Sequence, residues 1–68
     1  MKRILKIGID NIKIKIDVDE YIVYIFLSEY EDPITYPYDD VSNLINILEE
    51  YTTLYQIDIK RIIGVFYE

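Results

Sequence analysis

Apolar and polar residues alternate strictly between Asn11 and Asp19, where every second residue is Ile or Val. A period of two places successive side chains on opposite faces of an extended chain, so one face of this segment is apolar and the other is charged. The preceding segment alternates in the same way, with Leu5, Ile7 and Ile9 as its apolar positions. The pattern therefore predicts two β-strands, each with one dry face.

The dipeptide Asp10-Asn11 is the predicted turn between these strands, because both residue types tolerate positive φ. The pairs that a two-residue turn imposes are Ile9–Ile12, Ile7–Ile14 and Leu5–Ile16. All six residues fall on one face, so the turn and the hydrophobic pattern predict the same register.

A second two-residue turn, Asp19-Glu20, is predicted to lead into a third strand. The pairs that it imposes are Val18–Tyr21, Ile16–Val23, Ile14–Ile25 and Ile12–Leu27. These pairs continue the dry face. On the opposite face the third strand places Ile22, Tyr24 and Phe26 across from Asp17, Lys15 and Lys13. The second face of the expected meander is therefore only partly polar.

Residues 28–40 contain two prolines, five acids and no regular period, which is typical of a loop. From Val41 to Tyr55, apolar residues recur at helical spacing and predict one amphipathic helix that covers the dry face. Asp39 or Asp40 is the expected N-cap of this helix. A last strand is predicted over residues 57–67, with a bulge because Lys60-Arg61 interrupts the alternation.

The expected fold class is α+β, a small β-β-β-α-β domain. It consists of an antiparallel three-stranded meander plus a C-terminal strand, with one helix packed on one sheet face. A right-handed crossover would place the last strand parallel to the first, in the order 3-2-1-4. Residues 1–68 are expected to form a single domain, because so short a chain holds one core.

Composition adds expectations about where the protein acts. The absence of cysteine excludes disulfides and thiolate metal sites and is compatible with a reducing compartment. The longest apolar run, residues 21–27, is too short to span a bilayer, and Lys6 and Asp10 interrupt the apolar segment that a signal peptide requires. We expect a soluble cytoplasmic protein, of a cell or a host, with no membrane partner.

Catalytic machinery is not recognisable in the sequence. There is no histidine for acid–base work at neutral pH, and no Ser or Lys stands beside a recognisable base. Gly8 and Gly64 stand alone, so no glycine-rich phosphate loop exists. Paired acids such as Asp17 and Asp19 are more simply explained by a turn than by a calcium site. The prediction is a protein that is not an enzyme and has no cofactor or metal.

Charge is unevenly distributed around the net value of −6: residues 1–16 hold five basic residues and one acid, and residues 17–56 hold ten acids and no base. Tyrosines interleave with these acids. The candidate partner-binding residues are Glu29, Tyr30, Glu31, Asp32, Tyr36, Tyr38, Asp39, Asp40, Glu49 and Glu50. Tyrosine supplies stiff contact area, and carboxylates can stand where phosphates would contact a basic surface. The competing interpretation is that the acids only confer solubility.

The leading hypothesis is a non-enzymatic, protein-binding inhibitor that docks a basic protein surface, such as that of a nucleic-acid-binding enzyme. The absence of Ala, His and Trp beside abundant Ile, Lys, Asn and Tyr is typical of an AT-rich genome, which many viruses and mobile elements have. A viral or mobile-element inhibitor acting as a DNA mimic, in the manner of an anti-CRISPR, would fit this chemistry.

Two alternatives use the other face of the meander. Lys6, Lys13 and Lys15 beside Tyr24 and Phe26 pair cations with aromatic platforms, as single-stranded nucleic-acid-binding sheets do, although the net charge opposes direct nucleic-acid binding. In the other alternative, Ile22, Tyr24 and Phe26, together with Ile4, form the seam of a homodimer, because exposed apolar patches commonly mark contacts.

Overall fold

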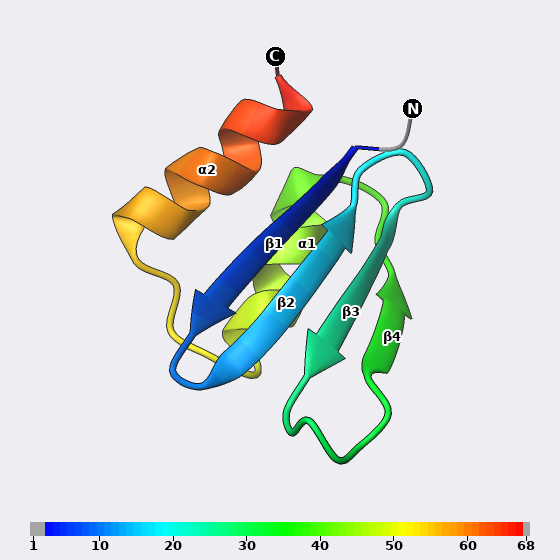
Figure 1. Cartoon of the computed structure of the whole chain (residues 1–68). Helices are drawn as coiled ribbons and strands as arrows, with labels where there is room; N and C mark the ends of the chain where they lie inside the picture. The colour runs from blue at the N-terminus through cyan, green and yellow to red at the C-terminus, as the bar shows by residue number, and fades with distance from the viewer. Residues whose placement is uncertain (1–2, 68) are drawn as a thin grey trace.

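The computed structural model describes residues 3–67, so Lys2 and Glu68, which contribute to the net charge, lie outside the described part. Four strands form one sheet and two helices follow them (Figure 1). The elements are β1 (Ile4–Ile9), β2 (Ile12–Asp17), β3 (Ile22–Phe26), β4 (Ile34–Pro37), α1 (Val41–Glu49) and α2 (Gln56–Phe66). The protein is a small α+β domain in which every strand pairing is antiparallel and the sheet order is β1-β2-β3-β4.

The predicted register of the first three strands is confirmed. The observed pairs include Ile9–Ile12, Ile7–Ile14, Leu5–Ile16, Ile16–Val23 and Ile14–Ile25. Asp10 and Asn11 both adopt positive φ, at 51° and 67°, as the tight turn between β1 and β2 requires. Leu27, the predicted partner of Ile12, lies beyond the end of β3 and is exposed.

The prediction of a loop over residues 28–40 is wrong where β4 forms. β4 pairs with β3 as the edge strand, with Ile34 beside Ile25. Just beyond β4, the Tyr38 N–H donates to the Tyr21 carbonyl at 3.0 Å. Because ladder bonds alternate, Pro37 occupies a position whose missing N–H would face away from β3. A proline at that position therefore costs no ladder bond.

The predicted C-terminal strand is also wrong, and with it the β-β-β-α-β order, the single helix and the sheet order 3-2-1-4. α1 ends at Glu49, and the last segment is the helix α2. Asp58 and Ile62, four residues apart, are both buried in α2, whereas Ile57 is 69% exposed. This is a helical period and not the alternation of a strand. The Asp58 carboxylate also accepts the Tyr55 N–H at 3.3 Å at the start of the helix.

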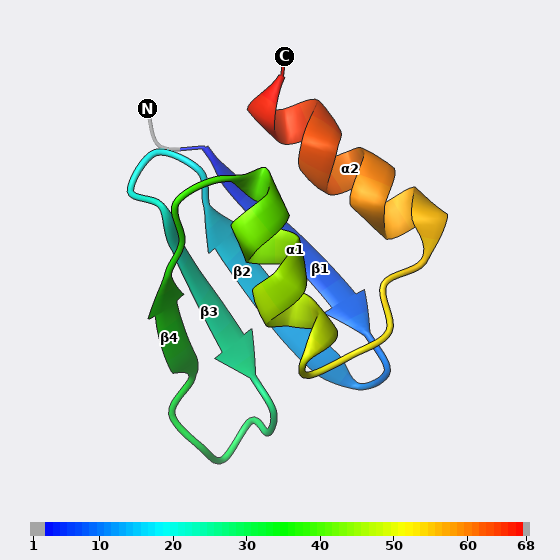
Figure 2. The same ribbon diagram turned by 180° about the vertical axis from the view of Figure 1, so that it is seen from behind.

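The core lies between one sheet face and α1, which crosses that face in Figure 2. Its buried apolar residues are Ile7, Ile9, Ile14, Ile16, Val18, Val23, Ile25, Tyr38, Leu44, Leu48 and Ile62. The prediction of Asp39 or Asp40 as the N-cap is confirmed for Asp40, whose carboxylate accepts the Asn43 N–H at 2.8 Å. Within residues 3–67, no helix packs on the opposite face of the sheet (Figures 1 and 2).

The helix α2 runs beside β1, at the edge of the sheet (Figure 1). The Arg61 guanidinium donates to the Lys6 carbonyl at 3.4 Å, and the Arg3 guanidinium donates to the Val65 carbonyl at 3.4 Å. These contacts attach the helix to the strand beside it. Neither α1 nor α2 is long and apolar enough to cross a membrane.

Candidate functional site

The structure divides the predicted acidic surface among three places. Residues 29–32 lie in the loop between β3 and β4, at one end of the sheet (Figure 1). Asp39 and Asp40 follow β4 at the opposite end of the sheet, before α1. Glu49 and Glu50 lie at the end of α1, behind the sheet in Figure 1. All seven acids are exposed, but they do not form one continuous surface.

The three candidate tyrosines also have different environments. Tyr38 is buried, and its hydroxyl donates to the Asp17 carbonyl at 2.8 Å, so it belongs to the core. Tyr36 is half-buried, and its hydroxyl shares a 2.5 Å hydrogen bond with that of Tyr51. Tyr30 is 90% exposed in the β3–β4 loop. Of the three, Tyr30 alone offers its whole ring to a partner.

The open face of the sheet gathers cationic and aromatic side chains from three adjacent strands. Two cross-strand rows define the group, which we name the basic face: Gly8–Lys13–Phe26 and Lys6–Lys15–Tyr24. These residues alternate with buried ones, so they face away from α1. The Lys15 ammonium lies 5.5 Å from the centre of the Tyr24 ring, within the range of a cation–π contact.

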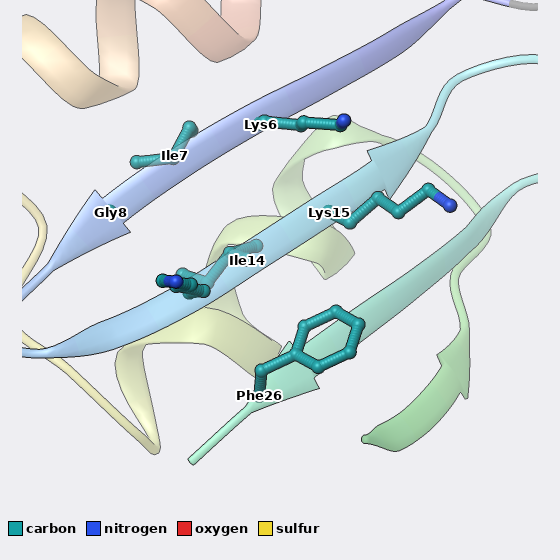
Figure 3. A pocket seen from close by; sticks show the side chains of 7 residues that line it. Lys6, Ile7, Gly8, Ile14, Lys15 and Phe26 are labelled. Carbon is teal, nitrogen blue, oxygen red and sulfur yellow. The ribbon is translucent and has the colours of Figure 1, made fainter. Parts of the chain in front are cut away.

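A hollow of about 470 Å³ lies in the basic face (Figure 3). Its lining residues are Lys6, Ile7, Gly8, Lys13, Ile14, Lys15 and Phe26. Lys6 and Lys15 extend in the same direction from adjacent strands, and the Phe26 ring stands on β3 (Figure 3). Gly8 has no side chain, and a Cβ placed there would have no heavy atom within 4 Å. The hollow is therefore open above the backbone of Gly8.

The local charge of the basic face is positive. Within residues 3–67, no ion pair joins Lys6, Lys13 or Lys15 to a carboxylate, and none of the residues lining the hollow is acidic. Asp17 lies on the next row of the same face, where it accepts the backbone N–H groups of the following turn at 3.1 and 2.9 Å. Glu29 lines a neighbouring depression together with Lys13 and Phe26.

Just before β1, Arg3 forms an ion pair with Asp19 at 3.2 Å. The Arg3 backbone N–H, which donates to this carboxylate at 2.6 Å, and then the Arg3 guanidinium hold the pKa of Asp19 below its usual value. This acid therefore stays ionised and is already paired. Because Asp19 is paired with Arg3, the lysines of the basic face remain the cations there that can contact an external anion.

The chemistry of this face suits binding. Ammonium groups contact phosphates, and aromatic rings stack on planar groups. Across the described residues, no cluster of three metal-ligating side chains exists. Sequence reasoning selected Lys6, Lys13, Lys15, Tyr24 and Phe26 but missed Gly8. The signal was present, because the predicted register already placed Gly8 beside Lys13 and so in the row of Phe26.

Comparison with protein-family models, with curated proteins and with solved structures found no match to this chain. The function is therefore inferred from the chemistry of the basic face itself.

Proposed function

We propose that this protein acts by binding, without catalysis, and that its basic face holds single-stranded nucleic acid. The observation that carries the proposal is the meeting of three lysines, none paired with a described carboxylate, and two aromatic rings on adjacent strands. Lysines neutralise phosphates, and each base stacked on a ring contributes about 1–3 kcal/mol. A single strand is the fitting ligand, because its unpaired bases can turn toward the rings.

The net charge of −6 is the main argument against this function. The arrangement of the acids weakens that argument. Residues 29–32 and Asp39-Asp40 lie at the two ends of the sheet, and Glu49 and Glu50 lie on the side that α1 covers. At physiological salt, exposed charges more than about 8 Å apart are largely screened. Glu29 is the exception, because it shares a depression with Lys13 and Phe26. Apart from this acid, a bound strand meets mainly the lysines beneath it.

A titration of a fluorescent single-stranded oligonucleotide, followed by anisotropy at several salt concentrations, tests the proposal. If three lysines contact phosphates, the slope of log K against log salt should be roughly −2, from about 0.7 per contact for single strands. Lys13→Ala with Lys15→Ala should lower the affinity and flatten the slope by roughly 1.4. Lys60→Ala, on the exposed side of α2, is the matched control and should change neither quantity.

A wild type that shows no oligonucleotide binding near physiological salt would contradict the proposal. Equal affinities for the wild type and the folded double-lysine variant would contradict it as well. Folding of each variant is checked by circular dichroism before the titration.

A second candidate function uses the β3–β4 loop to dock a basic protein surface, in the manner of an inhibitor that mimics DNA. The supporting observation is that Tyr30 is 90% exposed and is flanked by the exposed acids Glu29, Glu31 and Asp32. The same titration separates the two functions. Glu31→Gln with Asp32→Asn should not reduce oligonucleotide affinity, but should release a lysine- and arginine-rich peptide if the loop is the working surface. Tight oligonucleotide binding by the wild type would reject the DNA-mimic function.

A further inference from the structure

We infer that the hollow above Gly8 seats one unpaired nucleobase of the bound strand, beside the Phe26 ring. The inference rests on the proposed function and specifies which part of the ligand enters the hollow. It starts from a residue that the fold itself does not require. Glycine in a strand weakens it, because it loses more backbone entropy on folding and packs no side chain.

Two observations show that the fold does not require glycine at this position. Gly8 does not adopt positive φ, so its backbone conformation is open to any residue. A Cβ built on Gly8 would have no heavy atom within 4 Å, so no neighbour excludes a larger side chain. A glycine inside a strand often marks a place where a ligand approaches the backbone closely. Here the missing side chain is what leaves the hollow open.

The surroundings of Gly8 fit a planar, aromatic group attached to phosphates. Lys13 and the Phe26 ring complete the row of Gly8. The side chains of Ile7 and Ile14 are buried in the core, so at the hollow these residues contribute a floor of backbone. A base can lie over this floor against the ring, with its flanking phosphates toward the lysines.

The size and charge of the hollow agree with this occupant. Its volume of about 470 Å³ lies within the roughly 300–1,000 Å³ of small-molecule sites. Lys6 and Lys15 extend side by side from β1 and β2, in the direction away from Gly8 (Figure 3). They can contact successive phosphates of one strand, whereas a carboxylate-bearing ligand without a ring would leave the Phe26 side of the hollow unused.

Gly8→Val tests the seat directly. Valine favours strands and meets no clash here, so the variant should fold and should melt no lower than the wild type. Its side chain occupies the part of the hollow directly above residue 8, while every lysine remains. We expect at least a tenfold loss of affinity for a short single-stranded oligonucleotide. Gly64→Ala is the matched control: it also replaces a glycine with no neighbour within 4 Å, but on α2, and should leave the affinity unchanged.

A second arm changes the ligand and leaves the protein as it is. An oligonucleotide of the same length in which every nucleotide is abasic keeps its phosphates and loses its bases. The wild type should bind it at least tenfold more weakly than the complete oligonucleotide. Gly8→Val should show a much smaller difference between the two ligands, because the two changes remove the same interaction.

The outcomes separate this inference from the proposed function. A wild type that binds no oligonucleotide overturns both. A wild type that binds, together with a folded Gly8→Val variant of equal affinity, overturns the base seat and leaves the binding face intact. If Gly8→Val does not fold, the abasic arm decides: equal affinity of the wild type for both ligands, or for inorganic polyphosphate, overturns the seat.

Discussion

The hydroxyl of Tyr38 ties the residue after β4 to the end of β2. It donates to the Asp17 carbonyl at 2.8 Å, and the ring packs between Tyr21 and Phe66, with ring centres 5.5 and 5.9 Å away. Burial, followed by the nearby Asp17 carboxylate, raises the pKa of Tyr38 to about 12. A tyrosine that sequence reasoning assigned to a binding surface therefore contributes to stability instead.

The raised pKa of Tyr38 predicts how stability changes at alkaline pH. The folded-state pKa of about 12 lies above the ordinary value of 10.0, so folding favours the protonated phenol. This contribution is fully present below pH 10 and is lost as the pH rises toward 12. Thermal melts between pH 8 and pH 12 should show a steeper loss for the wild type than for Tyr38→Phe. At neutral pH the variant should be less stable by about 1 kcal/mol, because it leaves the Asp17 carbonyl without its donor.

Parallel melting curves for the wild type and Tyr38→Phe across that range would show that the phenol does not govern the alkaline transition. Tyr51 is the second tyrosine to consider, because its hydrogen bond with Tyr36 raises its pKa as well. Tyr51→Phe, which keeps Tyr38, is therefore the control that assigns the transition to one ring.

Residue-level prediction succeeded where neighbours in the sequence are also neighbours in space. The Asp10-Asn11 turn fixes the partner of every residue in the first hairpin, so the register followed from local chemistry. The same register contained the row of Gly8, Lys13 and Phe26. The burial of Tyr38 was not predictable in this way, because it depends on the Phe66 ring of a distant helix.

At the scale of elements, the N-terminus of α1 offers a paired test. The Asp40 carboxylate accepts the Asn43 N–H at 2.8 Å, whereas for Asp39 it is the backbone N–H that donates to the Asn43 side chain. Asp40→Ala should cost about 1 kcal/mol in the free energy of unfolding. Asp39→Ala should stay within about 0.5 kcal/mol of the wild type, since it leaves that backbone donor in place. Urea denaturation measures both, and equal losses would show that charge, and not capping, stabilises the helix.

The two elements that sequence reasoning missed have a common physical cause. Prolines at positions 33 and 37 argue against a strand, but Pro33 precedes β4, and an edge strand tolerates Pro37 where its N–H would face away from the neighbour. β-Branched Ile57, Ile59, Ile62 and Ile63 argue for a strand at the C-terminus. The segment is nevertheless a helix, because a helix there buries Ile62 and attaches α2 beside β1. The local conformational preferences of the residues could reveal neither the pairing of β4 with β3 nor the packing of α2 beside β1.

At the scale of the whole molecule, the order of the strands determines which charged side chains lie next to one another. The predicted meander already placed Lys13 and Lys15 beside Phe26 and Tyr24, so the basic face could be read from the sequence. The acids could not be placed, because their positions depend on where β4 and α1 lie. The resulting protein is acidic overall, with one sheet face whose central rows carry lysines and no acid.

A titration of the isotope-labelled protein with a single-stranded oligonucleotide, followed by amide chemical shifts at physiological salt, tests this account most directly. The account predicts that the largest changes fall on β1, β2 and β3 at Gly8, Lys13, Lys15, Tyr24 and Phe26, with little change in α1 or in residues 29–32. Changes centred on residues 29–32 or on the end of α1, or no changes at all, would contradict it.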